Sequence, residues 1–318
     1  MKQLPIEVIN ILSDRKSRSE VACNKTKNNI LSKHPELELI EKELRVAKAS
    51  KLIALLDEND TETIDNQIRH YEQSRERYLK IHGISLSYDQ PEPYCKTCND
   101  EGYINGQLCF CARHILSPIY FEKSGLKQYP DFSFDRHQPE LFPKSSKIHS
   151  IYRAVKVFSG FPAVRIPNML FWGPPGTGKT FLAVSFARVI VLNGYSVKFI
   201  RASELIDLMG EYKTIKRSFS PQPERSRTVN AERNFLRQCD LLIIDELGVE
   251  PKGVNDAAEL LQLLGDRLVP GKTTLITTNL SPTEMGKEYD DRLYSRLMGA
   301  FEIFGFEGKD LRIKAKIK

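Results

Sequence analysis

The sequence predicts an α/β domain built on a parallel sheet, preceded by a smaller helical part. From about residue 148, short apolar segments alternate with helical stretches, the pattern of a parallel sheet covered on both faces. A glycine-rich loop follows the first of these segments, and four cysteines fall within residues 95–111. At 318 residues the chain has room for about two domains. We divide it into a helical segment (1–90), a cysteine module (91–128), a linker (129–147) and the α/β domain (148–318).

Composition narrows the class of protein. With 41% hydrophobic and 28% charged residues, the chain is neither a disordered acidic protein nor a collagen-like one. No apolar run approaches the ~18 residues of a membrane span, and the first residues do not resemble a signal peptide. We therefore expect a cytoplasmic protein with no membrane contact. Residues 1–94 hold 15 Lys or Arg and 16 Asp or Glu, so the positive charge behind the chain's net +6 lies beyond them, where the balance is +7. That balance mildly favours an anionic ligand there.

The N-terminal part reads as two helices. Apolar residues recur at helical spacing over 35–56, and a second amphipathic stretch covers about 61–82. Pro91 and Pro93 end this pattern before the cysteines. The two stretches predict a helical hairpin.

The cysteine cluster predicts a structural metal site. A C-x2-C pair is followed, ten residues later, by a C-x-C pair. Four thiolates match a tetrahedral Zn²⁺ site, which leaves no open position for catalysis, and an iron–sulfur cluster is the lesser alternative. His114 could replace Cys111 as the fourth ligand, whereas Cys23 and Cys239 have no partners in the sequence. The predicted zinc ligands are Cys95, Cys98, Cys109 and Cys111.

Five apolar segments are the expected strands of the sheet. They cover residues 168–172, 197–201, 241–245, 274–278 and 300–304.

A complete phosphate-loop motif, G-x-x-x-x-G-K-T, follows the first expected strand and precedes a helical run. The glycines allow backbone N–H groups to surround phosphate oxygens, and the start of the helix favours negative charge. Lys179 would neutralise phosphate charge, and Thr180 would ligate Mg²⁺. The motif consists of Gly173, Pro174, Pro175, Gly176, Thr177, Gly178, Lys179 and Thr180.

Two later strands end in polar residues that complete such a site. Asp245 follows four apolar residues and would help to hold the Mg²⁺, while Glu246 would orient or deprotonate an attacking water. Asn279 ends the next strand and would sense the terminal phosphate. An acidic helix cap and an Asn-Leu-Ser-Pro turn are the simpler readings of these residues.

The order GPPGTGKT, LLIIDELG, TTN resembles the AAA+ ATPases. Residues 95–318 resemble bacterial replicative helicase loaders of the DnaC/DnaI type, with IstB-like transposition ATPases as near relatives, while residues 1–94 match no motif. The resemblance implies ATP and Mg²⁺ as cofactors alongside Zn²⁺. It also implies a hexameric replicative helicase of the DnaB type and single-stranded DNA as partners, with docking through the N-terminal part.

The resemblance further implies an arginine that acts across a subunit boundary on a neighbour's ATP, and hence self-association. By position this is Arg296, with Arg292 one turn earlier as the fallback. Arg312 resembles a late arginine of the family more weakly. Charge pairing along the helix is the simpler explanation. Only 14 residues follow the last expected strand, so we expect no C-terminal helical lid.

A helix expected over residues 204–219 carries basic side chains beside an apolar face. In the resembled loaders this region touches single-stranded DNA, which implies that Lys213, Lys216 and Arg217 contact phosphates. The alternative is a core-packed helix with a solvated charged face, and Tyr212 and Phe219 on the apolar face weaken any base stacking.

Three functional hypotheses follow from the sequence. The first is an ATP-dependent helicase loader, and the second is a transposition ATPase that shares the same motor. The third is an adaptor switched by nucleotide binding, with little turnover.

Overall fold

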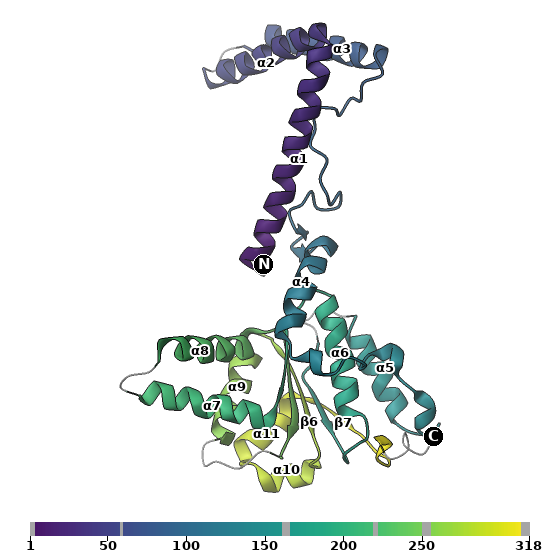
Figure 1. Ribbon diagram of the computed structural model, residues 1–318, viewed down its shortest axis with the longest axis vertical. Coiled ribbons are helices and arrows are strands. Elements are labelled where there is room, and N and C mark those ends of the chain that lie inside the picture. The colour runs from purple at the N-terminus through teal and green to yellow at the C-terminus, as the bar shows by residue number, and fades with distance from the viewer. Residues whose placement is uncertain (1–3, 58–59, 161–165, 219–221, 250–255, 313–318) are drawn as a thin grey trace. The chain divides into compact units, whose positions relative to one another are not determined.

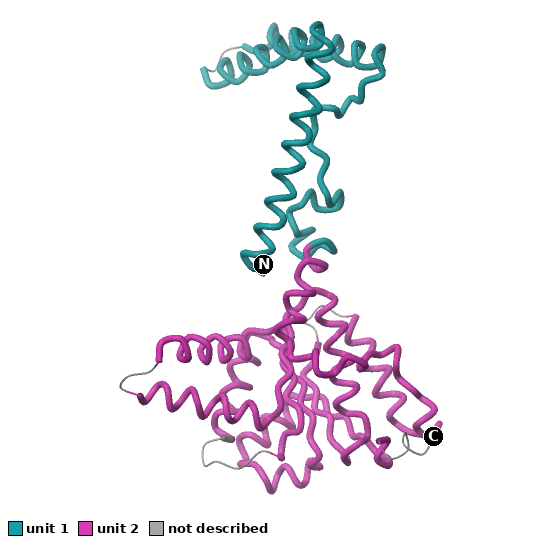
Figure 2. The backbone as a smooth tube through the Cα atoms, in the orientation of Figure 1, with its two compact units in different colours: residues 1–111 teal, residues 112–318 magenta. Residues whose placement is uncertain are grey.

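The computed structural model describes residues 4–57, 60–160, 166–218, 222–249 and 256–312 (Figure 1). The chain divides into two compact units, residues 1–111 and 112–318 (Figure 2).

Unit 1 is mostly helical. The helix predicted over 35–56 is α2 (Pro35–Leu56), and the one predicted over 61–82 is α3 (Glu62–Ile81). These two helices pack along each other, so the predicted hairpin is confirmed. Leu37, Leu79 and Tyr88 form the centre of the small core beside them.

A long first helix, α1 (Ile6–Lys33), is an element that the sequence reasoning did not identify. Along its 28 residues only Val8 and Leu12 are buried. A helix with so narrow an apolar stripe gives almost no periodic signal, because the signal comes from burial.

A short hairpin follows, formed by β1 (Tyr103–Ile104) and β2 (Gln107–Leu108) in antiparallel register. It lies between the two cysteine pairs. Asn105 at its turn has a φ of 49°, in the left-handed region that Asn tolerates better than most residues.

Unit 2 is built on a five-stranded, all-parallel sheet in the order β4-β5-β6-β3-β7. All five predicted strands are present, and the last begins two residues later than expected because Ala300 still belongs to the preceding helix. The carboxyl ends of parallel strands lie at one edge of the sheet, which is where the predicted site residues fall. The strands are β3 (Met169–Trp172), β4 (Val197–Arg201), β5 (Leu241–Leu247), β6 (Thr273–Thr278) and β7 (Glu302–Gly305).

Helices flank the sheet, which confirms the predicted fold class. A large core is shared by the strands and by α7 to α11, whereas α5 and α6 lie on the other side in Figure 1. Within the described residues, no helix is both long and apolar enough to cross a bilayer. The helices are α4 (Phe110–Lys123), α5 (Ile148–Phe158), α6 (Lys179–Leu192), α7 (Ala202–Arg217), α8 (Pro223–Gln238), α9 (Asp256–Leu268), α10 (Pro282–Glu288) and α11 (Asp291–Ala300).

Candidate nucleotide site

The phosphate-loop motif forms the turn between β3 and α6. Gly173 and Gly176 have φ angles of 143° and 73°, in the region that strongly favours glycine. Gly178 is the residue before the helix, and Lys179 is the first residue within it. The motif therefore places backbone N–H groups and the start of α6 around one small space, as an anion-binding loop requires.

Lys179 is nearly buried in this turn, and its ammonium group is held by three acceptors. Its Nζ donates to the carbonyl oxygens of Gly173 (2.6 Å) and Pro174 (2.8 Å) and to Oδ1 of Asn279 (2.9 Å). Burial lowers the pKa of Lys179 to about 8. The structure thus brings together two predicted site residues that lie 100 positions apart, and an arriving anionic phosphate would favour the charged ammonium.

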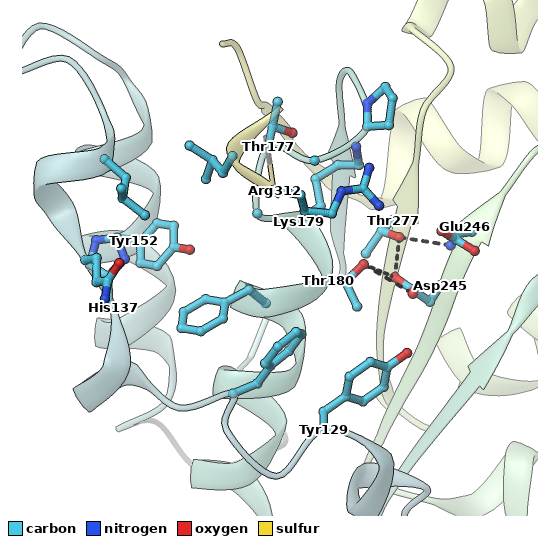
Figure 3. Close-up of a pocket in the computed structure, with 18 of the residues that line it drawn as sticks. Tyr129, His137, Tyr152, Thr177, Lys179, Thr180, Asp245, Glu246, Thr277 and Arg312 are labelled. Carbon is cyan, nitrogen blue, oxygen red and sulfur yellow. Dashed lines mark hydrogen bonds between the residues drawn. The ribbon is translucent and has the colours of Figure 1, made fainter. Parts of the chain in front are cut away.

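Asp245 lies at the carboxyl end of β5 with 2% of its surface exposed. Thr180 Oγ1 donates to Asp245 Oδ1 at 2.9 Å, and Thr277 Oγ1 donates to the same oxygen at 2.6 Å (Figure 3). Burial raises the pKa of the Asp245 carboxyl despite these bonds. The Thr180 hydroxyl and the Asp245 carboxylate are the hard oxygen donors that Mg²⁺ prefers, so the donor set fits that ion.

Glu246 is exposed and lies on the cavity wall beside Asp245. Its φ of 59° is unusual for glutamate. Its backbone N–H donates to Thr277 Oγ1 at 3.0 Å, which fixes the backbone at an irregular point near the end of β5 (Figure 3). Thr277 therefore links Asp245 and Glu246, a role that sequence reasoning missed. The sequence signal that could have revealed this role is the hydroxyl residue Thr277 itself, two positions before Asn279 at the end of the same strand.

The cavity at this edge of the sheet has a volume of about 460 Å³, and its end away from the phosphate loop is aromatic. His137 stacks on Tyr152 with ring centroids 3.9 Å apart, and burial lowers the pKa of His137. Much of this wall comes from residues 129–147, which we expected to be a linker. The segment shows little hydrophobic periodicity, so nothing in that pattern indicated that it lines a cavity. Its several aromatic residues were the signal that could have been used. The aromatic lining residues are Tyr129, Phe132, His137, Phe142, Tyr152 and Phe181.

The arginine predicted to act on a neighbour does not line this cavity. Arg296 and Arg292 are exposed on α11, where they line a separate shallow depression. Their role across a subunit boundary stays a prediction. Arg312, in contrast, does line the cavity of its own chain.

The three basic residues proposed to contact DNA lie in the second half of α7. Lys213 forms an ion pair with Glu259 at 3.3 Å, whereas Lys216 and Arg217 are exposed at the end of the helix. The Arg233 guanidinium lies over the Tyr212 ring, 4.1 Å from its centroid, which occupies that ring face. Phe219 lies outside the described residues.

In unit 1, the sulfur atoms of the four cysteines all lie within 4.8 Å of one another. The separation is 3.7 Å for Cys95 and Cys109 and 3.4 Å for Cys98 and Cys111, close to the edge of about 3.8 Å in a tetrahedron with 2.3 Å zinc–sulfur bonds. The sulfur of Cys111, and not the exposed His114, completes the group. The arrangement fits a structural zinc ion.

Fold and loop together define a P-loop ATP-binding domain. Residues 153–318 match the family described as IstB-like ATP binding protein, and the chain belongs to that family. It is 26% identical over 200 residues to the replicative helicase loader DnaC of Escherichia coli, covering 62% of this chain and 76% of that protein. It is 30% identical over 157 residues to an ATP-binding protein of insertion sequence IS5376 from Geobacillus stearothermophilus, covering 48% and 58%. A crystal structure of the DnaC helicase loader matches with a TM-score of 0.48 and 19% identity, covering 57% of this chain and 99% of that one.

Proposed function

We propose that this protein hydrolyses ATP to ADP and phosphate and uses the reaction to place a replicative helicase on single-stranded DNA. The observation that carries the hydrolysis is the meeting of Lys179, Thr180, Asp245 and Asn279, from three separate segments, at one end of a single cavity. The family and the likeness to DnaC support the larger function.

Each residue of the site has a separate role in binding or hydrolysing ATP. Lys179 and the loop N–H groups hold the β- and γ-phosphates, while the aromatic end of the cavity receives the base. Thr180 and Asp245 hold Mg²⁺, which neutralises charge on the phosphates when bound. Glu246 orients a water molecule for attack and accepts its proton, and Asn279 fixes the far side of the terminal phosphate. Arg296 of an adjacent subunit supplies a further cation to the transferring group.

Unit 1 is proposed to dock on the helicase. Its four-cysteine group would hold zinc and so fix the hairpin of β1 and β2. A run of apolar side chains at the end of α2 is exposed and available to a partner. These side chains are Leu52, Ile53, Leu55 and Leu56. The proposed site of action is the cytoplasm.

A second candidate is a transposition ATPase, favoured by the family description and by the likeness to the insertion-sequence protein. The two candidates share the ATP site and differ in partner. Unit 1 favours the loader, because the resemblance of the cysteine module is to loaders.

The test measures ATP turnover and delivery of purified replicative helicase to single-stranded DNA by the full chain and by Glu246→Gln. The loader account predicts helicase delivery by the wild type and loss of turnover in the variant. Delivery that is undiminished in the variant would favour the nucleotide-switched adaptor. A wild type that binds a transposase but never a helicase would favour the transposition ATPase.

A further inference from the structure

The end of β5 that carries the two acidic residues is irregular. The regular pairing with β6 stops at Ile244 and resumes at Leu247 with its register shifted by one residue. Asp245 and Glu246 therefore lie opposite a single residue of β6, Thr277. This arrangement of two residues against one is a β-bulge, which is rare between parallel strands and redirects side chains where it occurs.

The bulge changes where the two acidic side chains point. In a regular strand, consecutive side chains point to opposite faces of the sheet, whereas Asp245 and Glu246 both line the same cavity. The backbone at Glu246 has a φ of 59°, in the left-handed region that residues other than glycine rarely adopt. Such a conformation persists only where the surrounding structure holds it, so a restraint on Glu246 is needed.

The hydroxyl of Thr277 supplies such a restraint. It donates its proton to Asp245 Oδ1 at 2.6 Å and accepts the backbone N–H of Glu246 at 3.0 Å (Figure 3). A hydroxyl has one proton to donate and lone pairs to accept with, so the two bonds are compatible and form together. Thr277 is buried, and its single hydroxyl therefore bonds to both residues of the bulge.

The two bonds of the Thr277 hydroxyl differ in what depends on them. Asp245 Oδ1 also accepts from Thr180 Oγ1 at 2.9 Å, so its carboxylate keeps a donor when the Thr277 hydroxyl is removed. The bond to Glu246 acts on the backbone itself, at the residue whose φ is unusual. Loss of the hydroxyl should therefore disturb the direction of the Glu246 side chain more than the position of the Asp245 carboxylate.

We propose that Thr277 is a positioning residue, which holds Glu246 in the left-handed conformation so that its carboxylate faces the water that attacks the terminal phosphate. The inference rests on the proposed ATP site, and it names the group that directs the base of that site. Because Thr277 acts through Glu246, it contributes to the rate of hydrolysis and not to the affinity for ATP. Its loss should therefore lower kcat and leave KM nearly unchanged.

The test compares Thr277→Ala with Thr277→Ser, because both variants lack the methyl group and only the serine keeps a hydroxyl. The measurements are kcat and KM for ATP, and the thermal stabilisation of each protein by ATP with Mg²⁺. We expect Thr277→Ala to lower kcat about 10-fold or more, and Thr277→Ser to stay within about threefold of the wild type. KM and the stabilisation by ATP should correspond to affinities within about twofold of the wild type in both variants.

Three further variants separate positioning from folding. Thr278→Val is the matched control, because the buried Thr278 hydroxyl donates to the Leu247 carbonyl at 2.6 Å, at the other end of the same bulge. It should lower the melting temperature and leave kcat within about twofold. If Thr277→Ala does not fold, Thr277→Val removes the hydroxyl while keeping the branched shape. In the Glu246→Gln background, whose residual rate a single-turnover assay measures, Thr277→Ala should add less than about twofold.

The outcomes are distinct for this inference and for the ATP site. A wild type that neither binds nor hydrolyses ATP would overturn the proposed function and this inference with it. A wild type that hydrolyses ATP, combined with equal kcat values for Thr277→Ala and Thr277→Ser, would overturn the positioning role alone. The same holds for a loss that appears in KM instead of kcat, that Thr278→Val reproduces, or that is undiminished in the Glu246→Gln background.

Discussion

The two units of the chain bury their apolar residues to very different extents. In unit 2, every residue of β6 and all of β5 except Glu246 are buried, and α6 buries nine of its 14 residues. In unit 1, α1 buries two residues of 28, and the end of α2 exposes four large apolar side chains in five positions. Unit 2 is therefore built around an extensive buried core. Unit 1 has a smaller core with polar anchors beside it, and it leaves large apolar side chains at the end of α2 exposed.

Polar anchoring in unit 1 centres on Glu41. The Arg75 Nε donates to Glu41 Oε1 at 2.6 Å, and the Tyr88 hydroxyl donates to the same oxygen at 2.8 Å. A second arm of the Arg75 guanidinium pairs with Asp89 at 3.0 Å. These contacts join α2, α3 and the segment after α3, where unit 2 would use a larger apolar core.

The largest expected effect is the loss of ATP turnover by unit 2, with helicase binding by unit 1 unchanged. Lys179→Ala removes the buried ammonium that would meet the phosphates, and we expect kcat/KM for ATP to fall about 100-fold or more. Binding of the helicase through unit 1 should persist without nucleotide. A steady-state ATPase assay measures the loss of turnover, and a helicase capture assay measures the retained binding. If Lys179→Ala hydrolyses ATP nearly as fast as the wild type, the phosphates do not bind at Lys179.

Zinc removal should have the converse effect. A strong chelator, or Cys98→Ser, should release one zinc per chain and expose the backbone of residues 95–111 to hydrogen exchange, because a four-thiolate site supplies folding energy to a small module. Protection of α6 should be unchanged. Cys23→Ser, which lies outside the cysteine group, is the matched control. Zinc content of zero in the native protein would refute the assignment.

The Glu41 anchor should make the stability of unit 1 depend on pH. Burial alone would raise the pKa of Glu41, but hydrogen bonds from Arg75 and Tyr88 outweigh it and hold the pKa below its ordinary value of 4.5. A lowered folded pKa stabilises the fold above that value, and the benefit is lost as the pH falls from 4.5 through the folded pKa.

Arg75→Met tests this anchor. It should cost unit 1 about 1–3 kcal/mol of unfolding free energy at pH 7 and remove most of the acid dependence. Arg77→Met, on the exposed side of the same helix, serves as its control. Denaturant unfolding at pH 7 and pH 4 measures the unfolding free energy of each variant. Equal losses of unfolding free energy in Arg75→Met and Arg77→Met would show that the anchor is unimportant.

The smallest expected effect concerns DNA. Lys216→Ala and Arg217→Ala should each reduce the slope of log affinity against log salt for single-stranded DNA by about 1. Lys213→Ala should have less effect, because that ammonium already pairs with Glu259. Lys287→Ala on α10 is the control. Unchanged slopes for all three variants would move the DNA contact away from α7.

The contrast between the units also explains what the sequence could predict. The strand at 197–201 and the helix at 35–56 were predicted with their observed bounds, because burial imposes a period that the residues reveal. The phosphate loop, Asp245 and Asn279 were recognisable because each lies at or just after the carboxyl end of such a strand. The helix α1 was missed because almost none of it is buried. The aromatic end of the cavity was missed, and Arg312 was named without its place at the cavity, because tertiary packing alone brings these segments to the loop.

In the proposed loader, unit 1 binds the helicase while unit 2 turns over ATP. The direct test is capture of purified replicative helicase by the full chain, by Cys98→Ser and by Lys179→Ala, each with and without ATP. We expect the wild type and Lys179→Ala to retain the helicase, and Cys98→Ser to lose it while still hydrolysing ATP. Failure of the wild type to bind the helicase under every nucleotide condition would contradict it.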